Sequence, residues 1–378
     1  MLAYWVYPMG FLLEDYLFKS RHGGAVFAAA QVSETKIRLK IRSMNTIRPM
    51  KTRASLNIWY SYVAAFLAIW AFLVFGARWY GEVLRQWPVA LVMALGSLVA
   101  GSTPMGGGAV SFPFLVLWTG TAPGEARDFG LMIQALGMTS AMIFMLCRRV
   151  RIQGWILFGT ILGAAGGMLA GTIVIAPHVA SNFVKLLFAC TWMSFAMLTI
   201  PKNREFCSIT GVRPLSIRTA MLVGLIVGIS GGVIASLIGL GVEMLLYTVL
   251  ILLYRCDLRI AVPTAVSAMA VTSIFGLITH LWLGDISHDV AMKFLAAGPV
   301  VIFGAPIGTY IVSVIPRIHI LYVVSFLCVA QFVWTLHRLE RTPAELRFVA
   351  GVMTSAGVVF YLMYRWGRAH RVQSAGAG

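Results

Sequence analysis

Residues 102–113 read STPMGGGAVSFP and interrupt an otherwise apolar part of the chain. The apolar segments on either side, 88–101 and 109–120, are each too short to cross a bilayer comfortably. Lipid offers no hydrogen-bond partner to a freed backbone N–H or C=O, so irregular backbone at membrane depth must be buried in protein or line a wet cavity. The stretch therefore predicts a broken helical hairpin inside a membrane protein.

Composition supports this interpretation along the whole chain. Only 11% of the 378 residues are charged, against about 25% in a soluble domain. Apolar runs of about 20 residues recur, which predicts an all-α polytopic membrane protein. The formal charge of +17 does not indicate nucleic-acid binding, because the basic residues lie in short loops and at the two ends.

The apolar runs divide the chain into six parts. We expect these to be a basic cytoplasmic tail, an extra span, a first transmembrane repeat, a second repeat, another extra span and a short cytoplasmic tail, at 1–57, 58–77, 88–201, 219–336, 346–364 and 365–378. Within the repeats, further spans are predicted at 128–147, 155–176, 182–200, 260–283, 290–315 and 318–336. The first tail lacks the pattern of a signal peptide. It is expected to lie on anionic lipid, unless translation starts at Met44 or Met50.

A second break, GLGVEMLLYT at 239–248, repeats the first in degenerate form. An offset of 135 residues (239 − 104) pairs Gly96 with Gly231 and Gly106 with Gly241. The same order of break, long span and glycine-rich span follows in both halves. The two breaks are therefore expected to be halves of one site.

Loop charge sets the expected topology. With the basic N-terminal tail inside, the basic loops at 148–151 and 202–218 and the C-terminal tail fall inside, and the acidic loop at 285–289 falls outside. The basic residues at 338–347 are the exception, since they fall outside. Each repeat then makes an odd number of crossings, so the second is inverted relative to the first. In transporters with this layout, substrate binds near the midplane among broken helices.

The chemistry expected at the breaks is anion binding. A broken helix exposes N–H groups where its second half begins, and those groups and the helix dipole attract anions. Glycines let a ligand approach the backbone, and hydroxyl and amide side chains add donors. The alternative is a packing kink with no ligand. The candidate substrate-binding residues are Ser102, Thr103, Gly106, Gly107, Gly108, Ser111, Gln134, Gly239, Gly241, Thr264 and Ser267.

Four polar residues within apolar segments need interpretation, and three of them have two interpretations each. Glu243 could couple transport to protons or could cap the second break by accepting backbone N–H groups. Gln134, which the offset pairs with Met269, could donate to an oxyanion or join two helices. Asp128 is expected to cap the helix over 128–147. His280 is either a gate or proton relay, or structural.

Glycines also recur at four-residue spacing, at 159, 163, 167 and 171 and again at 224, 228 and 232. In membranes, such spacing lets two helix backbones approach closely. We therefore interpret both series as helix-packing faces.

The glycines at 106–108, the following Pro113, then Glu125 and Ala126, and the degenerate second copy together resemble the TauE/SafE sulfite exporter family, also called the sulfonate or anion permease family. The resemblance covers about 88–336. It implies a carrier of sulfite, sulfonates or related small organosulfur anions, working with the proton gradient.

The resulting hypothesis is a secondary transporter of small sulfur oxyanions in the inner or plasma membrane, acting by alternating access, with both termini cytoplasmic. An anion channel built on the same breaks is the alternative. An enzyme is not expected, because the histidines have no catalytic spacing. No cofactor or metal is expected either, because no Gly-Lys-Ser/Thr follows the glycines and no CxxC pair is present.

Overall fold

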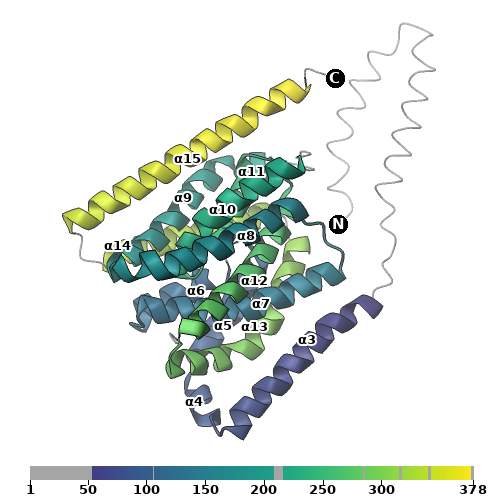
Figure 1. Ribbon diagram of the computed structural model, residues 1–378, viewed down its shortest axis with the longest axis vertical. Helices are drawn as coiled ribbons and strands as arrows, with labels where there is room; N and C mark the ends of the chain where they lie inside the picture. The colour runs from purple at the N-terminus through teal and green to yellow at the C-terminus, as the bar shows by residue number, and fades with distance from the viewer. Residues whose placement is uncertain are drawn as a thin grey trace. The chain divides into compact units, whose positions relative to one another are not determined.

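The computed structural model describes residues 53–104, 106–207, 216–283, 286–314, 317–338 and 342–375. Within these ranges the chain is helical and contains no strand (Figure 1). The helices discussed below belong to the unit formed by residues 55–378. The basic N-terminal tail predicted at 1–57, with its alternative start sites, lies outside the described residues except for its last few positions.

The helices follow the predicted spans closely. In chain order they are α3 (Arg53–Ala71), α4 (Tyr80–Arg85), α5 (Trp87–Ser102), α6 (Gly108–Pro113), α7 (Pro123–Cys147), α8 (Gly154–Ala170), α9 (Ser181–Cys207), α10 (Ile217–Ile238), α11 (Val242–Leu252), α12 (Leu258–Leu283), α13 (His288–Val314), α14 (Arg317–Arg338) and α15 (Pro343–Ala375). Short π-helical turns extend α3 to Gly76, α6 to Trp118 and α8 to Ile175.

Seven helices in the described ranges are long and apolar enough to cross a membrane. They are Leu56–Gly76, Pro123–Cys147, Gly154–His178, Ile217–Ile238, Leu258–Leu283, His288–Ile311 and Pro343–Gly367. Helices α5 and α11, which flank the two predicted breaks, are shorter than a span. The prediction of a polytopic all-α membrane protein is confirmed.

Two helices form the centre of the bundle. Most of the apolar stretch of α7 and of α12 is buried inside the protein, and the two helices pack against each other. Around them, α13 packs on α5 and α7, and α11 packs on α12. The predicted extra spans, α3 and α15, are mostly exposed and run along opposite sides of the bundle in Figure 1. Their apolar surface therefore suits contact with lipid.

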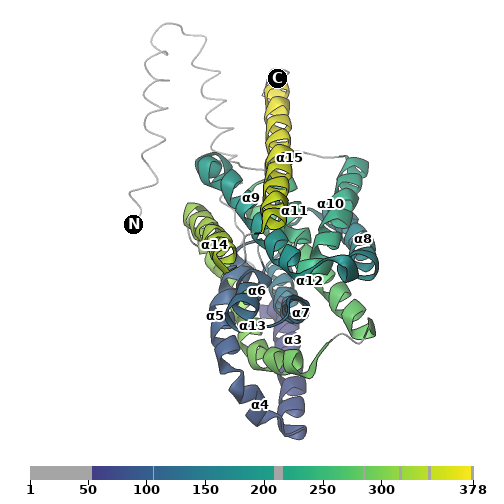
Figure 2. The same ribbon diagram turned by 90° about the vertical axis from the view of Figure 1, so that its left-hand side faces the viewer.

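Helices α8 and α10 pack side by side over most of their length (Figure 2). A Cβ added to Gly163 would overlap the carbonyl oxygen of Leu225, and one added to Gly228 would overlap that of Thr160. Only glycine permits backbones to approach this closely. The prediction that these glycines form packing faces is confirmed.

The C-terminal helix α15 is joined to the rest of the bundle near its end. The Tyr364 hydroxyl donates to Glu205 Oε2 over 2.8 Å, and the other oxygen of Glu205 accepts from Arg255. A Cβ on Gly367 would overlap the carbonyl oxygen of Leu252. Helix α15 is thereby held against the last turn of α11.

Candidate functional site

The first break lies between α5 and α6. Helix α5 ends at Ser102, Thr103 is extended, and Gly106 has a φ of +67°, which L side chains rarely adopt. The hydroxyls of Ser102 and Thr103 both donate to the carbonyl oxygen of Val99, over 3.0 and 2.8 Å. They therefore provide partners for one of the carbonyl groups that the end of α5 leaves without a bond inside the helix.

The second break lies between α10 and α11 and depends on two glycines. Gly239 has a φ of +79° and donates its N–H to the carbonyl oxygen of Ala235 over 2.7 Å. Gly241 has a φ of +144° and precedes α11. These conformations are available to glycine at little cost and strain other residues. Both predicted interruptions are thus present at the predicted positions.

Glu243 lies in the first turn of α11, and its side chain is almost fully buried. Its Oε1 accepts the N–H of Gly241 over 3.1 Å. This is the geometry that the capping interpretation predicted. No ion pair within the described residues involves Glu243, so an ionised carboxylate would have only backbone donors to offset its burial.

Gln134 of α7 lies where the two breaks meet. Its Nε2 donates to the carbonyl oxygen of Gly239 over 3.3 Å, and its Oε1 accepts from Ser273 over 3.4 Å. A Cβ added to Gly108 in the first break would lie 2.8 Å from Gln134 Nε2 and would overlap the side chain of Leu240 in the second. The Gln134 amide therefore touches both breaks. It also joins α7 to α12 through Ser273, as the helix-joining interpretation predicted.

Met269 occupies the corresponding position on α12. A Cβ on Gly106 would lie 2.5 Å from Met269 Sδ. Gln134 and Met269, which the 135-residue offset pairs, thus both lie where the two breaks meet. We call this place the junction. The offset was the sequence signal that could have placed Met269 beside Gln134. The Met269 thioether is nevertheless a poor ligand for an oxyanion.

Two hydroxyls close to the breaks have no hydrogen-bond partner within the described residues. They are Ser111 Oγ on α6 and Thr248 Oγ1 on α11, and both are buried. A buried polar group left without a partner costs about 1–3 kcal/mol. Such hydroxyls suit a ligand or water that completes their hydrogen bonds.

Thr264 and Ser267 are not brought to the junction by any contact of their hydroxyls. Thr264 Oγ1 donates to the carbonyl oxygen of Ile260 over 2.7 Å and accepts the N–H of Gln153 over 3.0 Å. Ser267 Oγ donates to the carbonyl oxygen of Pro263 over 2.8 Å. Both hydroxyls thus bond within their own helix, and Thr264 also holds the loop before α8.

Comparison with protein families identifies the chain. A family model described as Sulfite exporter TauE/SafE matches residues 89–335. The chain belongs to the TauE/SafE family. The match begins in α5 and ends in α14, so it includes both breaks and leaves out the extra helices α3 and α15. Neither the curated proteins nor the solved structures yielded a match.

Membership in the TauE/SafE family has a direct functional consequence. Members of the family are transporters, and a sulfite-type anion is their kind of substrate. With its apolar helices, the chain is a multi-pass membrane transport protein.

This TauE/SafE protein has a cavity at each end of α7. One, of about 650 Å³, is lined near the start of α7 by Glu125, Arg127 and Asp128. The other, of about 320 Å³, is lined near its end by Phe144, Met145 and Arg148. At 1.5 Å per residue these positions lie roughly 30 Å apart along the helix, close to the thickness of a bilayer core. The buried junction at Gln134 lies between them.

The cavity at the start of α7 is bordered by a charged cluster that joins three helices. Arg127 Nε donates to Asp128 Oδ1 over 2.8 Å, and its Nη1 donates to the carbonyl oxygen of Ser236, on α10, over 3.2 Å. Its Nη2 lies 3.2 Å from Nδ1 of His280 on α12. The cluster ties the start of α7 to the helix end that leads into the second break.

The prediction that Asp128 caps α7 is wrong. The helix begins at Pro123, so Asp128 lies in its second turn and pairs with Arg127 instead. Pro at the first position is itself a helix-start signal and marks the true boundary. His280, almost fully buried beside these residues, fits its structural interpretation. Arg127 was missed because its partners Ser236 and His280 are far away in the sequence.

Proposed function

We propose that the protein is a secondary transporter of small sulfur oxyanions that works by alternating access. The observation that supports this most is the meeting of two glycine-rich helix breaks at Gln134, between cavities at opposite ends of α7. Transporters of this kind hold substrate at discontinuous helices and open to one side at a time. Apart from the half-buried Ser102, the predicted site residues are buried, as an occluded conformation requires.

Three kinds of donor would hold the anion at the junction. The hydroxyls of Ser111 and Thr248 have no partner among the described residues. The amide of Gln134 can turn from Gly239 to a ligand, and the N–H of Gly241 can exchange its bond to Glu243 for a bond to the anion. Hydrogen bonds to an anion are roughly twice as strong as neutral ones. The bonds that close the junction can therefore be exchanged for bonds to substrate.

We also propose that the two halves are inverted repeats in the inner or plasma membrane, with both termini cytoplasmic. The loop charges support this arrangement. The equivalence of Gln134 and Met269 at the junction supports a common origin of the halves.

Reconstitution into liposomes tests the proposed function and separates a carrier from a channel. The purified protein is expected to accumulate labelled sulfite or a short sulfonate against its concentration gradient when a proton gradient is imposed. A channel built on the same breaks can only dissipate a gradient. Uptake that stops at equilibrium under every imposed gradient would show a channel instead.

Glu243 is proposed to link proton movement to anion movement. A buried carboxylate without an ion-pair partner favours its protonated form, and protonation removes the repulsion between its charge and an anion bound near it. Glu243→Gln is expected to leave folded yield unchanged and to remove the pH dependence of transport, because glutamine is permanently neutral. The initial uptake rate, measured in liposomes across a pH series, checks this. A variant with the wild-type pH profile would leave Glu243 with the capping role alone.

A further inference from the structure

We propose that the cavity at the end of α7 is a binding vestibule for an anion with an apolar body, so that the preferred substrate is a short organosulfonate and not inorganic sulfite. This inference rests on the proposed function and narrows its substrate class. It is carried by the side chains that line the cavity and by their charge.

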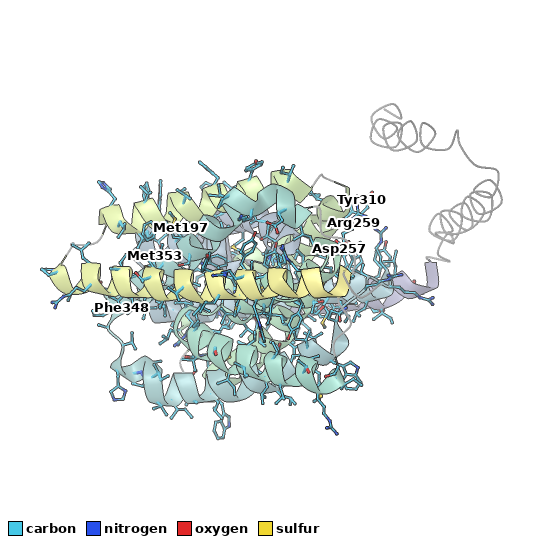
Figure 3. All side chains as sticks on the ribbon, turned by 90° about the horizontal axis from the view of Figure 1, so that it is seen from above. Met197, Asp257, Arg259, Tyr310, Phe348 and Met353 are labelled. Atoms are coloured by element: carbon cyan, nitrogen blue, oxygen red, sulfur yellow. The ribbon has the colours of Figure 1, made fainter. Side chains whose placement is uncertain are left out.

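Four helices contribute residues that line the vestibule. Phe144 and Arg148 come from the end of α7, Leu258 and Arg259 from the start of α12, Tyr310 from α13 and Gly101 from α5. Figure 3 shows Arg259 and Tyr310 next to each other at one end of the bundle. Helix α5 ends beside this cavity and leads into the first break, and α12 runs from the cavity to Met269 at the junction. An anion in this cavity therefore lies on the way to the breaks.

The positive charge of the vestibule is available to a ligand. The Arg148 guanidinium lies 5.1 Å from the ring centroid of Phe144 and 5.3 Å from that of Tyr310, so both rings hold it in place. Neither Arg148 nor Arg259 forms an ion pair with a described residue. The nearby Asp257 accepts the backbone N–H of Arg259 over 2.8 Å, which caps the start of α12. A guanidinium matches the paired oxygens of a sulfonate.

The two cavities differ in charge, and the difference favours an anion here. None of the described residues that line the vestibule is a carboxylate. At the other end of α7, Arg127 shares its cavity with Glu125 and Asp128 and is already paired with Asp128. The vestibule is therefore the more positive of the two cavities and attracts an anion more strongly.

Apart from Thr309, whose hydroxyl donates to the carbonyl oxygen of Pro306, the remaining lining is largely apolar, which determines the kind of anion. Met145, Val150, Leu258 and Val262 surround the arginines together with the two aromatic rings. A volume of about 320 Å³ corresponds to roughly ten waters at about 30 Å³ each. Sulfite has no carbon to place against this surface, whereas a short alkanesulfonate does. Each buried methylene is expected to raise affinity about fourfold.

A close helix contact separates the vestibule from the junction. Gly101 lines the cavity and directly precedes Ser102, the last residue of α5. A Cβ on Gly101 would overlap the carbonyl oxygen of Ala305, on α13. Movement of α13 away from α5 at this point would connect the vestibule with the first break.

Ligand binding to the purified full-length protein in neutral-lipid nanodiscs tests the inference. Calorimetric titrations would use sulfite and the methane-, ethane- and propanesulfonates. We expect affinity to rise about fourfold per methylene and to be lowest for sulfite. Arg148→Gln and Arg259→Gln are each expected to weaken propanesulfonate binding at least tenfold, whereas Arg149→Gln, which replaces an exposed neighbour outside the lining, leaves it unchanged.

The outcomes separate this inference from the proposed function. Equal affinity for sulfite and the sulfonates, or sulfonate binding that neither arginine variant weakens while the variants keep the wild-type unfolding temperature, overturns the vestibule and leaves the transporter standing. Absence of binding and of transport for every sulfur oxyanion overturns both. Repeating the titration in anionic-lipid nanodiscs identifies the source of the ligand. Unchanged affinity supports a soluble sulfonate, and competition that depends on Arg148 assigns the cavity to a lipid headgroup instead.

Discussion

Replacing Gly163 with alanine is expected to lower the thermal unfolding temperature of the protein more than any conservative surface change. The new methyl would overlap the carbonyl oxygen of Leu225 and lie 2.9 Å from the N–H nitrogen of Ile229, so α8 and α10 must move apart. Neither contact is the end of a flexible side chain, and overpacking of this kind costs about 1–3 kcal/mol or more. Differential scanning fluorimetry in detergent measures the loss.

Gly166 of the same helix provides the matched control. A Cβ added there meets nothing within 4 Å, so Gly166→Ala should be neutral or should stabilise α8 by about 0.5–1 kcal/mol, as alanine does in a helix interior. Gly228→Ala, on the facing helix, should reproduce the loss because its methyl would overlap the carbonyl oxygen of Thr160. Equal unfolding temperatures for the Gly163 and Gly166 variants would contradict the proposed role of the glycine spacing.

The helix breaks and helix spans are the features that the local sequence could predict. A helix break needs residues such as Gly239 and Gly241, whose positive φ follows from the absence of a Cβ. Helix spans need only enough apolar residues to cross a bilayer. Both are properties of neighbouring residues, so the positions of the helices and of the two breaks could be predicted from the order of the residues.

Contacts between distant residues could not be predicted in this way. Gln134 bonds to Gly239, and Arg127 bonds to Ser236 and His280, from positions more than 100 residues apart. Which face of α7 meets which turn of α10 depends on packing along the whole helix. For this reason Gln134 had two open interpretations, and Arg127 was overlooked although its neighbour Asp128 was considered.

The 135-residue offset between the two breaks supplied part of this long-range information. It paired Gln134 with Met269, and the structure brings the two to the same junction. It could not position Thr264 and Ser267, whose hydroxyls bond to their own helix. Serine and threonine in apolar helices commonly bond to the carbonyl one turn earlier, so their presence alone is weak evidence for a ligand.

Arg127→Gln is expected to destabilise the protein by about 3–5 kcal/mol, the usual cost of removing one partner of a buried ion pair. The Asp128 side chain is only 4% exposed, and the Arg127 guanidinium is its close charged partner at 2.8 Å. The substitution also removes the guanidinium's bond to Ser236 at the end of α10. The second break should therefore loosen together with the start of α7. Thermal unfolding measures the stability loss, and hydrogen exchange across residues 236–243 measures the loosening.

An exposed ion pair and a double variant serve as controls for the expected destabilisation by Arg127→Gln. His288 and Glu82 also lie 2.8 Å apart, but their side chains are 60% and 53% exposed. His288→Gln should therefore cost at most about 1 kcal/mol. Adding Asp128→Asn to Arg127→Gln should recover part of the loss, because it removes the buried charge that the single variant leaves without its partner. If the single and double variants are equally unstable, the loss comes from the bond to Ser236 and not from the buried charge. In that case Arg127 acts as a mechanical link between α7 and the second break.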